Sequence, residues 1–435
     1  MSNNPVPYGF CRVTGQPLVP IVDLGEQFVS DFVPPGHERE GELLSLKLGM
    51  GPTGLIQMYD VCDSDKMYRK YWYRSSVNES MRKSLEELVT DTVNFPGLKL
   101  EKGDLVVDIA SNDGIMLTHK AYDDCFRIGV DPSDVARDGL YSSKLPQPHK
   151  QSWLINDYFS EETFRAECEK IGIEPLAKIV TIVAMFYDIQ DPVGFLKQVK
   201  NILHPEGVLC IQLSYTPLMF TQCAFDNICH EHVMYYTLDT LEQVAEAAGL
   251  TIQDCELNSV NAGSLRVYIT HQENDRSQVP LHIKDVENTR RLAIGSYEDN
   301  LGLDCASTWR DWHGRIMDVG RELVEFLQTA RDEGKRVVGY GASTKGNTIL
   351  QTWGIGRDLV ESIAERSEPK WGTVCIGTGI PVISEAEMRA NRPDYLLVLP
   401  YTFAGMFLER EKELLKAGTK FIVPLPRLQV LGDER

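Results

Sequence analysis

Long apolar runs, paired cysteines and an excess of positive charge are all missing from this sequence of 435 residues. No stretch approaches the roughly 20 apolar residues of a membrane-spanning helix, so no membrane partner is expected. The ten cysteines include no Cys-x-x-Cys pair, which favours reduced thiols and a cytoplasmic protein. The amino terminus lacks the basic and apolar regions of a signal peptide, so none is expected. A net charge of −19 argues against nucleic acid as a standing partner.

The length and the pattern of apolar residues predict about three domains. Residues 1–70 are rich in turn signals and are predicted to form a small irregular β module. Residues 71–270 begin with a helix and continue as apolar strands alternating with helices, ending in two consecutive strands that predict an antiparallel edge pair. After a polar linker at 271–285, a long amphipathic helix around 309–326 precedes a second alternation. The predicted class is α/β, in which residues 284–435 form a second Rossmann-like domain after a central one.

The segment VVDIASNDGIML contains an apolar strand, an acid at its end and a tight turn. Open α/β sheets bind ligands where such a loop leaves the first strand. Asp108 is predicted to orient the loop or a ligand amine, and Gly114 to let the backbone approach the ligand. The rest of the predicted loop is Ala110, Ser111 and Asn112.

Two further acids follow the next strands. Asp131 is expected to accept both hydroxyls of a ribose. Asp157 is a candidate contact for an adenine amine, although an Asp before a Tyr is also a common turn. A ribose fits NAD as well as S-adenosylmethionine, but NAD needs glycine-lined backbone for its pyrophosphate. Because this loop carries Asp113 instead, a cationic sulfonium is favoured, and a purely structural turn is the alternative.

A second strand–turn–helix segment, VVGYGASTKGNTIL, lies in the last third of the chain. Free amides at the start of its helix attract anions, and Lys345 adds a positive charge beside the hydroxyls of Ser343 and Thr344. No Ser or Thr follows the lysine, so the segment is not a P-loop. It is interpreted either as a diphosphate site or as a lysine that only solvates a helix start.

The stretch CHEHVMYY (229–236) collects the side chains best suited to chemistry. Metal binding by Cys229, His230 and His232 is one interpretation, but no fourth ligand is evident. A polar strand end with satisfied histidines is the second. The third is a catalytic base, because imidazole titrates near neutrality and the stretch is predicted at the carboxyl edge of the first sheet.

Six stretches in a fixed order carry a resemblance to a known family: YWYRSSV (71–77), DIASNDG (108–114), AFDNICHEHVMYYTL (224–238), NAGSLRVY (261–268), VVGYGASTKGNT (337–348) and FIVPLP (421–426). Over nearly its whole length the chain resembles the sugar-nucleotide C-methyltransferases. The resemblance implies an N-terminal metal-binding module, a central S-adenosylmethionine domain and a C-terminal domain that helps hold a sugar nucleotide.

The chain departs from that family at three places. The zinc module keeps only Cys11, and its other ligand positions correspond to Thr14, Met50 and Thr53. A lone thiol cannot build a tetrahedral zinc site, so we predict no zinc and no other metal. Cys229 stands where the family has a tyrosine. Further along the chain, Asn261 and Ala262 replace a histidine and a glycine of the family. The changes at Cys229 and Asn261 are therefore expected to alter the accepted sugar or lower the activity.

The resemblance also implies roles for individual residues. His232 is the expected base that removes a proton beside a ketone, with Glu231 orienting it or supporting the imidazolium. Hydroxyl or amide donors would stabilise the enolate: Tyr71, Tyr73 and Asn261. The substrate would be bound by Tyr73, His230, Arg266, Ser343, Lys345 and Asn347.

The expected reaction is methyl transfer from S-adenosylmethionine to the carbon, C-3, beside the ketone of a nucleotide-diphosphate 4-keto-6-deoxyhexose, leaving S-adenosylhomocysteine. One alternative is an NAD-dependent sugar-nucleotide oxidoreductase. The other is a non-catalytic sugar-nucleotide-binding relative. Neither the nucleotide, the stereochemistry of the sugar nor the oligomeric state can be derived from the sequence.

Overall fold

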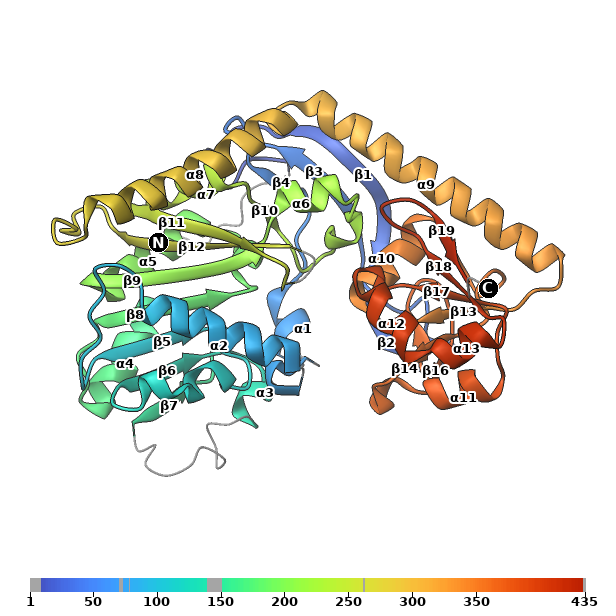
Figure 1. The fold of residues 1–435 in the computed structure, drawn as a ribbon, viewed down its shortest axis with the longest axis horizontal. Coiled ribbons are helices and arrows are strands. Elements are labelled where there is room, and N and C mark those ends of the chain that lie inside the picture. Colours follow the sequence, from blue (N-terminus) through green and yellow to red (C-terminus); the bar gives the residue numbers. More distant parts are fainter. Residues whose placement is uncertain (1–8, 70–72, 78, 139–150, 261–262, 433–435) are drawn as a thin grey trace.

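The computed structural model describes residues 9–69, 73–77, 79–138, 151–260 and 263–432. Its strands form sheets of seven, six and four strands and one two-stranded pair. Figure 1 shows two lobes joined along one side by helices α8 (Leu281–Leu301) and α9 (Ala306–Asp332), with the N-terminal strands between them. The predicted α/β class is confirmed, while the domain boundaries remain predictions. None of the helices in the described ranges has both the length and the apolar character needed to cross a bilayer.

The central sheet has the strand order β11-β12-β9-β8-β5-β6-β7. The five strands from β9 to β7 are parallel, and β12 and β11 continue the sheet antiparallel, which confirms the predicted edge pair. The order reverses between β5 and β8, the kind of position where such sheets bind ligands. The strands are β5 (Leu105–Ile109), β6 (Phe126–Val130), β7 (Ser152–Ile155), β8 (Ala177–Val183), β9 (Leu203–Ser214), β11 (Leu250–Asn258) and β12 (Ser264–His271).

Both faces of this sheet are covered, which is why its strands are continuous apolar runs. On one face, Val106 of β5 belongs to a buried cluster with residues of α2 (Glu79–Val93). On the other face, Val107 packs in a cluster with α4 (Glu161–Ile171), α5 (Pro192–Ile202) and α7 (Leu238–Ala247). Adjacent residues of one strand point to opposite faces, so a five-residue strand supports two cores. The short helix α3 (Asp134–Arg137) follows β6, and α6 (Thr216–Thr221) follows β9.

The N-terminal sheet, in the order β1-β3-β4-β10, is not made from the N-terminal residues alone. Its strands are β1 (Val19–Phe28), β3 (Leu43–Met50) and β4 (Ile56–Met58), completed by β10 (Met234–Tyr235). Strand β10 lies within the stretch CHEHVMYY (229–236), which is called the CHEH stretch below. Strand β2 (Phe32–Val33) pairs instead with β15 (Val374–Cys375) in the C-terminal lobe. Helix α1 (Ser64–Tyr68) leads towards the central sheet. The N-terminal strands therefore connect both lobes.

The C-terminal sheet has the order β16-β14-β13-β17-β18-β19, parallel except for β19. Its strands are β13 (Val337–Tyr340), β14 (Ile363–Glu365), β16 (Val382–Ser384), β17 (Tyr395–Val398), β18 (Lys420–Val423) and β19 (Gln429–Leu431), and its helices are α10 (Thr344–Thr352), α11 (Glu385–Ala390), α12 (Ala404–Arg410) and α13 (Lys412–Lys416). At the turn after β13, Gly341 has φ +88°, and a Cβ there would lie 2.7 Å from Pro400 Cγ, so glycine is required.

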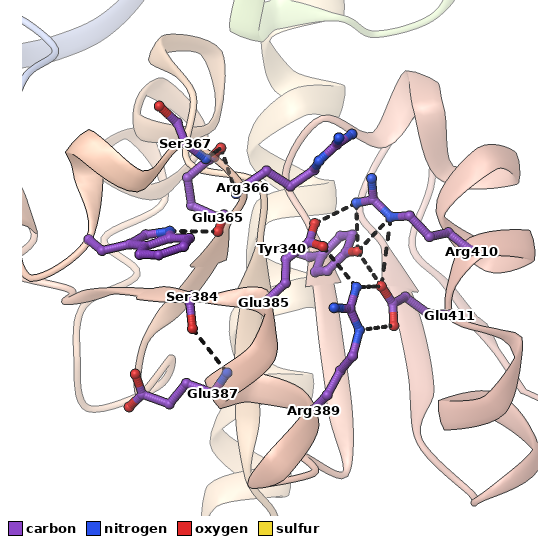
Figure 2. A network of polar contacts seen from close by, with 11 residues as sticks. Tyr340, Glu365, Arg366, Ser367, Ser384, Glu385, Glu387, Arg389, Arg410 and Glu411 are labelled. Atoms are coloured by element: carbon purple, nitrogen blue, oxygen red, sulfur yellow. Dashed lines mark hydrogen bonds and ion pairs between the residues drawn. The ribbon is translucent and has the colours of Figure 1, made fainter.

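A polar network fixes β13 to the helices beside it (Figure 2). The Glu411 carboxylate, 3% exposed, accepts hydrogen bonds from Tyr340 Oη at 2.7 Å and from Arg389 Nε at 2.9 Å. Arg410 donates to the same tyrosine oxygen and, at 2.7 Å, to Glu385. These contacts join β13, α11 and α12, so they hold the scaffold that carries α10.

Two long helices bridge the lobes. The predicted amphipathic face of α9 is confirmed, since Trp309, Trp312 and Leu323 are fully buried. Trp312 Nε1 donates to the Phe220 carbonyl of α6 at 2.8 Å. Helix α8, with 21 residues, was not predicted, and its start at Leu281 lies inside the expected linker.

Candidate active site

The loop after β5 is tightly wound, and three of its residues have left-handed backbone. Ala110 has φ 62° and Asn112 has φ 51°, both unusual for residues other than glycine, and Gly114 has φ 81°. Asn112 is held from both sides: Oδ1 accepts from Ser75 N at 3.0 Å, and Nδ2 donates to the Tyr73 carbonyl at 3.0 Å. The segment 73–76 thus packs against this loop, and we read the strained backbone as held for function.

Two of the predicted acids stand at the base of the loop. Asp108 is 3% exposed and accepts a hydrogen bond from Thr181 Oγ1 at 2.8 Å, and its burial raises its pKa to about 8. Asp131 accepts from Asn112 N and from Ser133 N, each at 2.8 Å, and so ties the tip of β6 to the loop after β5. A carboxylate oxygen can accept more than one hydrogen bond, so the ribose contact expected of Asp131 remains a proposal.

The other predicted groups around this loop differ in position. Tyr73 is 41% exposed beside the loop, and burial of its phenol together with the charge of Asp113 raises its pKa, so it remains a hydrogen-bond donor at neutral pH. Asp157 is exposed and accepts from Tyr158 N at 2.9 Å, as in a simple turn. Its neighbour Asn156 donates to the Asp131 carbonyl at 2.8 Å, and the adenine contact expected of Asp157 remains a prediction. Tyr71 and Asn261 lie outside the described residues.

The CHEH stretch lies between the central sheet and the N-terminal sheet. Val233 N donates to the Tyr187 carbonyl at 2.9 Å, and the Val233 carbonyl accepts from Met58 N of β4 at 2.9 Å. Tyr187 follows β8, the neighbour of β5, and its ring centroid lies 4.4 Å from that of His232. The stretch is therefore beside the carboxyl end of β8.

His232 is held in a defined tautomer. Its Nδ1 lies 2.8 Å from the Asn227 carbonyl oxygen. Since a carbonyl only accepts, Nδ1 carries the proton and Nε2 is the basic nitrogen. The side chain is 9% exposed, and burial together with the charge of Lys345 lowers its pKa to about 3. The orienting group is thus Asn227 rather than the predicted Glu231.

The other members of the stretch have shifted pKa values or face another part of the protein. Burial raises the pKa of Glu231, and the charge of Lys345 opposes that rise. Burial and the neighbouring Glu231 raise the pKa of the Cys229 thiol, which therefore stays protonated. His230 is 6% exposed and its Nε2 lies 3.3 Å from the Leu44 carbonyl of β3. It faces the N-terminal sheet, so its expected substrate contact remains a prediction.

The C-terminal lobe contributes Lys345 to this place. Its Nζ donates to Asn227 Oδ1 at 2.6 Å, across the contact between α10 and the 3-10 turn Phe225–Asn227. Ser343 is the N-cap of α10 and accepts from Gly346 N at 3.0 Å. Asn347 is 2% exposed, and its Oδ1 has no partner within the described ranges. Thus Lys345 lies beside His232, whereas Ser343 caps the helix.

Arg266 has a different environment from the one expected. It is 4% exposed on β12, and its Nη1 forms ion pairs with Asp91 of α2 at 2.8 Å and with Glu256 of β11 at 2.7 Å. Its Nε donates to Gln212 of β9 at 2.9 Å. Nε and Nη1 are thus used within the protein, which favours a structural role, while the predicted substrate contact of Arg266 remains a prediction.

Two family models together match most of this chain. A model of the methyltransferase domain matches residues 56–254, and a model of the C-methyltransferase C-terminal domain matches residues 259–426. The chain is 27% identical over 391 residues to C-methyltransferase NovU from Streptomyces niveus, covering 87% of this chain and 86% of that protein. The protein is an S-adenosylmethionine-dependent C-methyltransferase.

Solved structures resemble the methyltransferase only distantly. The mitomycin 7-O-methyltransferase MmcR is 15% identical with a TM-score of 0.33, and the alignment covers 44% of this chain and 54% of MmcR, about half its length. The magnesium protoporphyrin IX methyltransferase ChlM from Synechocystis PCC 6803 is 11% identical with a TM-score of 0.34, over 45% of this chain and 88% of ChlM.

The loop after β5 fits S-adenosylmethionine on chemical grounds. Ser111 Oγ and Asp113 Oδ1 are buried without a hydrogen-bond partner among the described residues, although buried polar atoms normally have one. The loop from Asp108 to Gly114 contains two acids and no basic residue. Acidic and unpartnered oxygens suit a cationic ligand that carries amino and hydroxyl groups, so the predicted cofactor residues of this loop remain our proposal.

A metal ion is the alternative ligand of the CHEH stretch. Within the described ranges, Cys229, Glu231 and His232 are the one group whose donor atoms could hold a metal, and these atoms lie within 4.8 Å of one another. The positive charge of Lys345, however, acts on each of the three side chains. For Cys229 and Glu231 it opposes the larger rise in pKa that burial causes. A divalent ion would have to bind beside this positive charge, which costs Coulomb energy in a buried site. The absence of a metal remains a prediction.

Several residues around the site were not predicted as site residues. Asn227 holds both Lys345 and His232 of the methyltransferase, yet it belongs to no chemical motif. Tyr401 donates to Asp226 Oδ1 at 2.6 Å, from the C-terminal lobe to the same loop. Asp188 is a buried acid after β8 whose pKa is raised by burial and by Glu231. Only the folded arrangement reveals these partners.

Proposed function

We propose that the methyltransferase transfers a methyl group to C-3, beside the ketone, of a nucleotide-diphosphate 4-keto-6-deoxyhexose. The observation that carries the proposal is His232, an uncharged imidazole with a proton-bearing Nδ1 and a basic Nε2, packed against Tyr187 at the carboxyl end of β8. The six stretches that resemble the sugar-nucleotide C-methyltransferases support the substrate class.

The proposed chemistry starts at the substrate. The ketone acidifies the neighbouring C–H bond, and Nε2 of His232 takes its proton while the electron pair forms an enolate. Hydroxyl or amide donors stabilise the enolate oxygen, for which Tyr73 is the described candidate and Tyr71 and Asn261 are the others. The bound S-adenosylmethionine supplies an electrophilic methyl group on a positively charged sulfur.

The low pKa of His232 has to rise during this reaction. An imidazole with a pKa of about 3 is a weak base in the free protein. A negative charge that forms next to it favours the imidazolium and raises its basicity. Proton transfer is thus coupled to enolate formation, and Glu231 is placed to support the imidazolium. For the diphosphate, we keep Ser343, Lys345 and Asn347 at the start of α10 as the proposed contacts.

Mass spectrometry of products formed from a panel of keto-sugar nucleotides tests the proposal directly. The expected result is one methyl group added at the carbon beside the ketone, with formation of S-adenosylhomocysteine. In H232Q the amide can still donate to the Asn227 carbonyl but cannot act as a base, so kcat should fall about 10²–10⁴-fold with unchanged affinity for S-adenosylhomocysteine. H37Q, at an exposed histidine paired with Glu40, is the matched control.

Other outcomes select the alternatives. Binding of NAD without binding of S-adenosylhomocysteine would indicate the oxidoreductase. Binding of both methyl donor and sugar nucleotide without product from any donor would indicate the non-catalytic relative. An H232Q enzyme with normal turnover would remove the base assignment.

A further inference from the structure

Lys345 is connected to His232 through a single residue. Its Nζ donates to Asn227 Oδ1 at 2.6 Å. The orientation of that amide is fixed, because Asn227 Nδ2 donates to the Ala224 carbonyl at 2.9 Å. The oxygen of the side chain therefore points to Lys345, and its position depends on the lysine.

The backbone of the same asparagine holds the base. The Asn227 carbonyl accepts from His232 Nδ1 at 2.8 Å and from Tyr235 Oη at 3.3 Å. The 3-10 turn that carries Asn227 packs against α10, and its neighbour Asp226 is bound by Tyr401. The base is thus mounted on a loop that the C-terminal lobe holds in place.

We propose that Lys345 is a positioning residue for His232: it fixes the base through Asn227, and its ammonium balances the negative charge that proton abstraction creates on the substrate. The proposal goes beyond diphosphate binding by α10 and rests on the proposed function for its second half. Figure 1 shows α10 on the side of the C-terminal lobe that faces the other lobe, as this role requires.

The charges around His232 support this role. Cys229 and Glu231 lie on the same loop as His232, and Tyr187 and Asp188 lie on the turn after β8. The Tyr235 hydroxyl comes from β10, and Lys345 comes from α10. Among these described groups Lys345 is the one whose side chain brings a positive charge to His232.

Proton transfer creates one positive and one negative charge here and leaves the sum of the charges unchanged. Before it, the ammonium of Lys345 faces the Glu231 carboxylate and His232 is neutral. After it, the imidazolium and the ammonium face the enolate and the carboxylate, two charges of each sign. Because opposite charges in a poorly hydrated site attract strongly, removing Lys345 would leave the enolate side short of one positive charge.

Three substitutions of Lys345 separate position from charge. K345Q keeps a donor for Asn227 Oδ1 but loses the charge, K345M loses both, and K345R keeps the charge. K412M, at a surface lysine paired with Glu409, is the control. The first measurement is the titration of His232, followed by NMR of labelled histidine in the substrate-free protein. His232 should become protonated at a pH at least about one unit higher in K345Q and K345M than in the parent, since a neighbouring cation disfavours the imidazolium.

Steady-state kinetics supply the second measurement. We expect kcat to fall about 10²-fold in K345M and less in K345R, without a matching rise in KM for the methyl donor. Unchanged titration of His232 in both K345Q and K345M would overturn the proposal. So would a rise in KM for the sugar nucleotide at constant kcat, which would make Lys345 a simple phosphate anchor. If the enzyme methylates no keto sugar, the proposed function fails, while the titration still decides whether Lys345 acts on His232.

Discussion

Replacing Arg266 by methionine separates a structural role from substrate binding. Breaking a buried ion pair costs about 3–5 kcal/mol when the remaining charge is left buried. Here the carboxylates left behind are those of Asp91 and Glu256, which are 51% and 38% exposed and can be hydrated. The buried Gln212 oxygen keeps a donor, Asn258 Nδ2, at 3.0 Å.

These observations set the magnitude. Methionine preserves most of the aliphatic contacts of Arg266, which is 4% exposed. The free energy lost is therefore that of the hydrogen bonds and ion pairs of the guanidinium. We expect R266M to lower the free energy of unfolding by about 2–3 kcal/mol, below the full value for a buried pair and above the 0–1 kcal/mol of an exposed one. Affinity for the sugar nucleotide should not change.

Urea unfolding followed by circular dichroism gives the stability, and steady-state kinetics give KM and kcat. R321M is the matched control, because Arg321 and its partner Asp318 are both exposed, at 72% and 66%, and the change should be below about 0.5 kcal/mol. A tenfold higher KM for the sugar nucleotide in R266M with unchanged stability would refute the structural assignment and restore the substrate contact.

Three further predictions concern pH, metal and the contact between the lobes. The pKa of Asp108, raised to about 8 by burial, exceeds its unfolded value near 4, so the native state holds this proton more tightly and stability should fall as pH rises from about 4 to about 8. D108N should flatten that part of the curve of urea midpoint against pH, and parallel curves would contradict the assignment. Elemental analysis should find far less than one zinc per chain, and EDTA should leave the urea midpoint unchanged; equimolar zinc whose removal destabilises the protein would show that the Cys11 module or the CHEH stretch holds metal. Y401F removes the 2.6 Å donor to Asp226, which is 4% exposed, and should cost about 1–3 kcal/mol in urea unfolding; a change below about 0.5 kcal/mol would mean that this hydrogen bond is not needed.

Much of the fold could be predicted because the relevant pattern is local. The strands of both large sheets are apolar runs bounded by turns, and α9 repeats its buried residues at steps of three and four. Helix α8 was not predicted because its buried residues do not form an apolar pattern at helical spacing. Two of its three buried residues are glutamates: Glu298 accepts from Tyr215 Oη at 2.7 Å, and Glu287 is paired with Arg276 at 2.7 Å. A pattern of hydrophobicity cannot find a helix that buries carboxylates.

The candidate site was predicted in part for the same reason. The loop after β5 and the CHEH stretch are continuous segments, so their chemistry is readable from neighbouring letters. The link from Lys345 to Asn227 spans 118 residues and depends on how two lobes are placed. The charge of Arg266 is visible in the sequence, but its ion-pair partners Asp91 and Glu256 come from other elements and could not be predicted.

The largest hydrophobic cluster of the protein has a consequence for recombination between relatives. It contains Leu46 of the N-terminal sheet, Phe225 beside the CHEH stretch, Trp312 of α9 and Ile363 of the C-terminal sheet. The two matching family models divide the chain between residues 254 and 259, yet this cluster takes residues from both sides of that division. A hybrid gene joined there would combine surfaces that never evolved together, so grafting a foreign C-terminal half would require the matching segments 19–58 and 219–228 to be transferred with it.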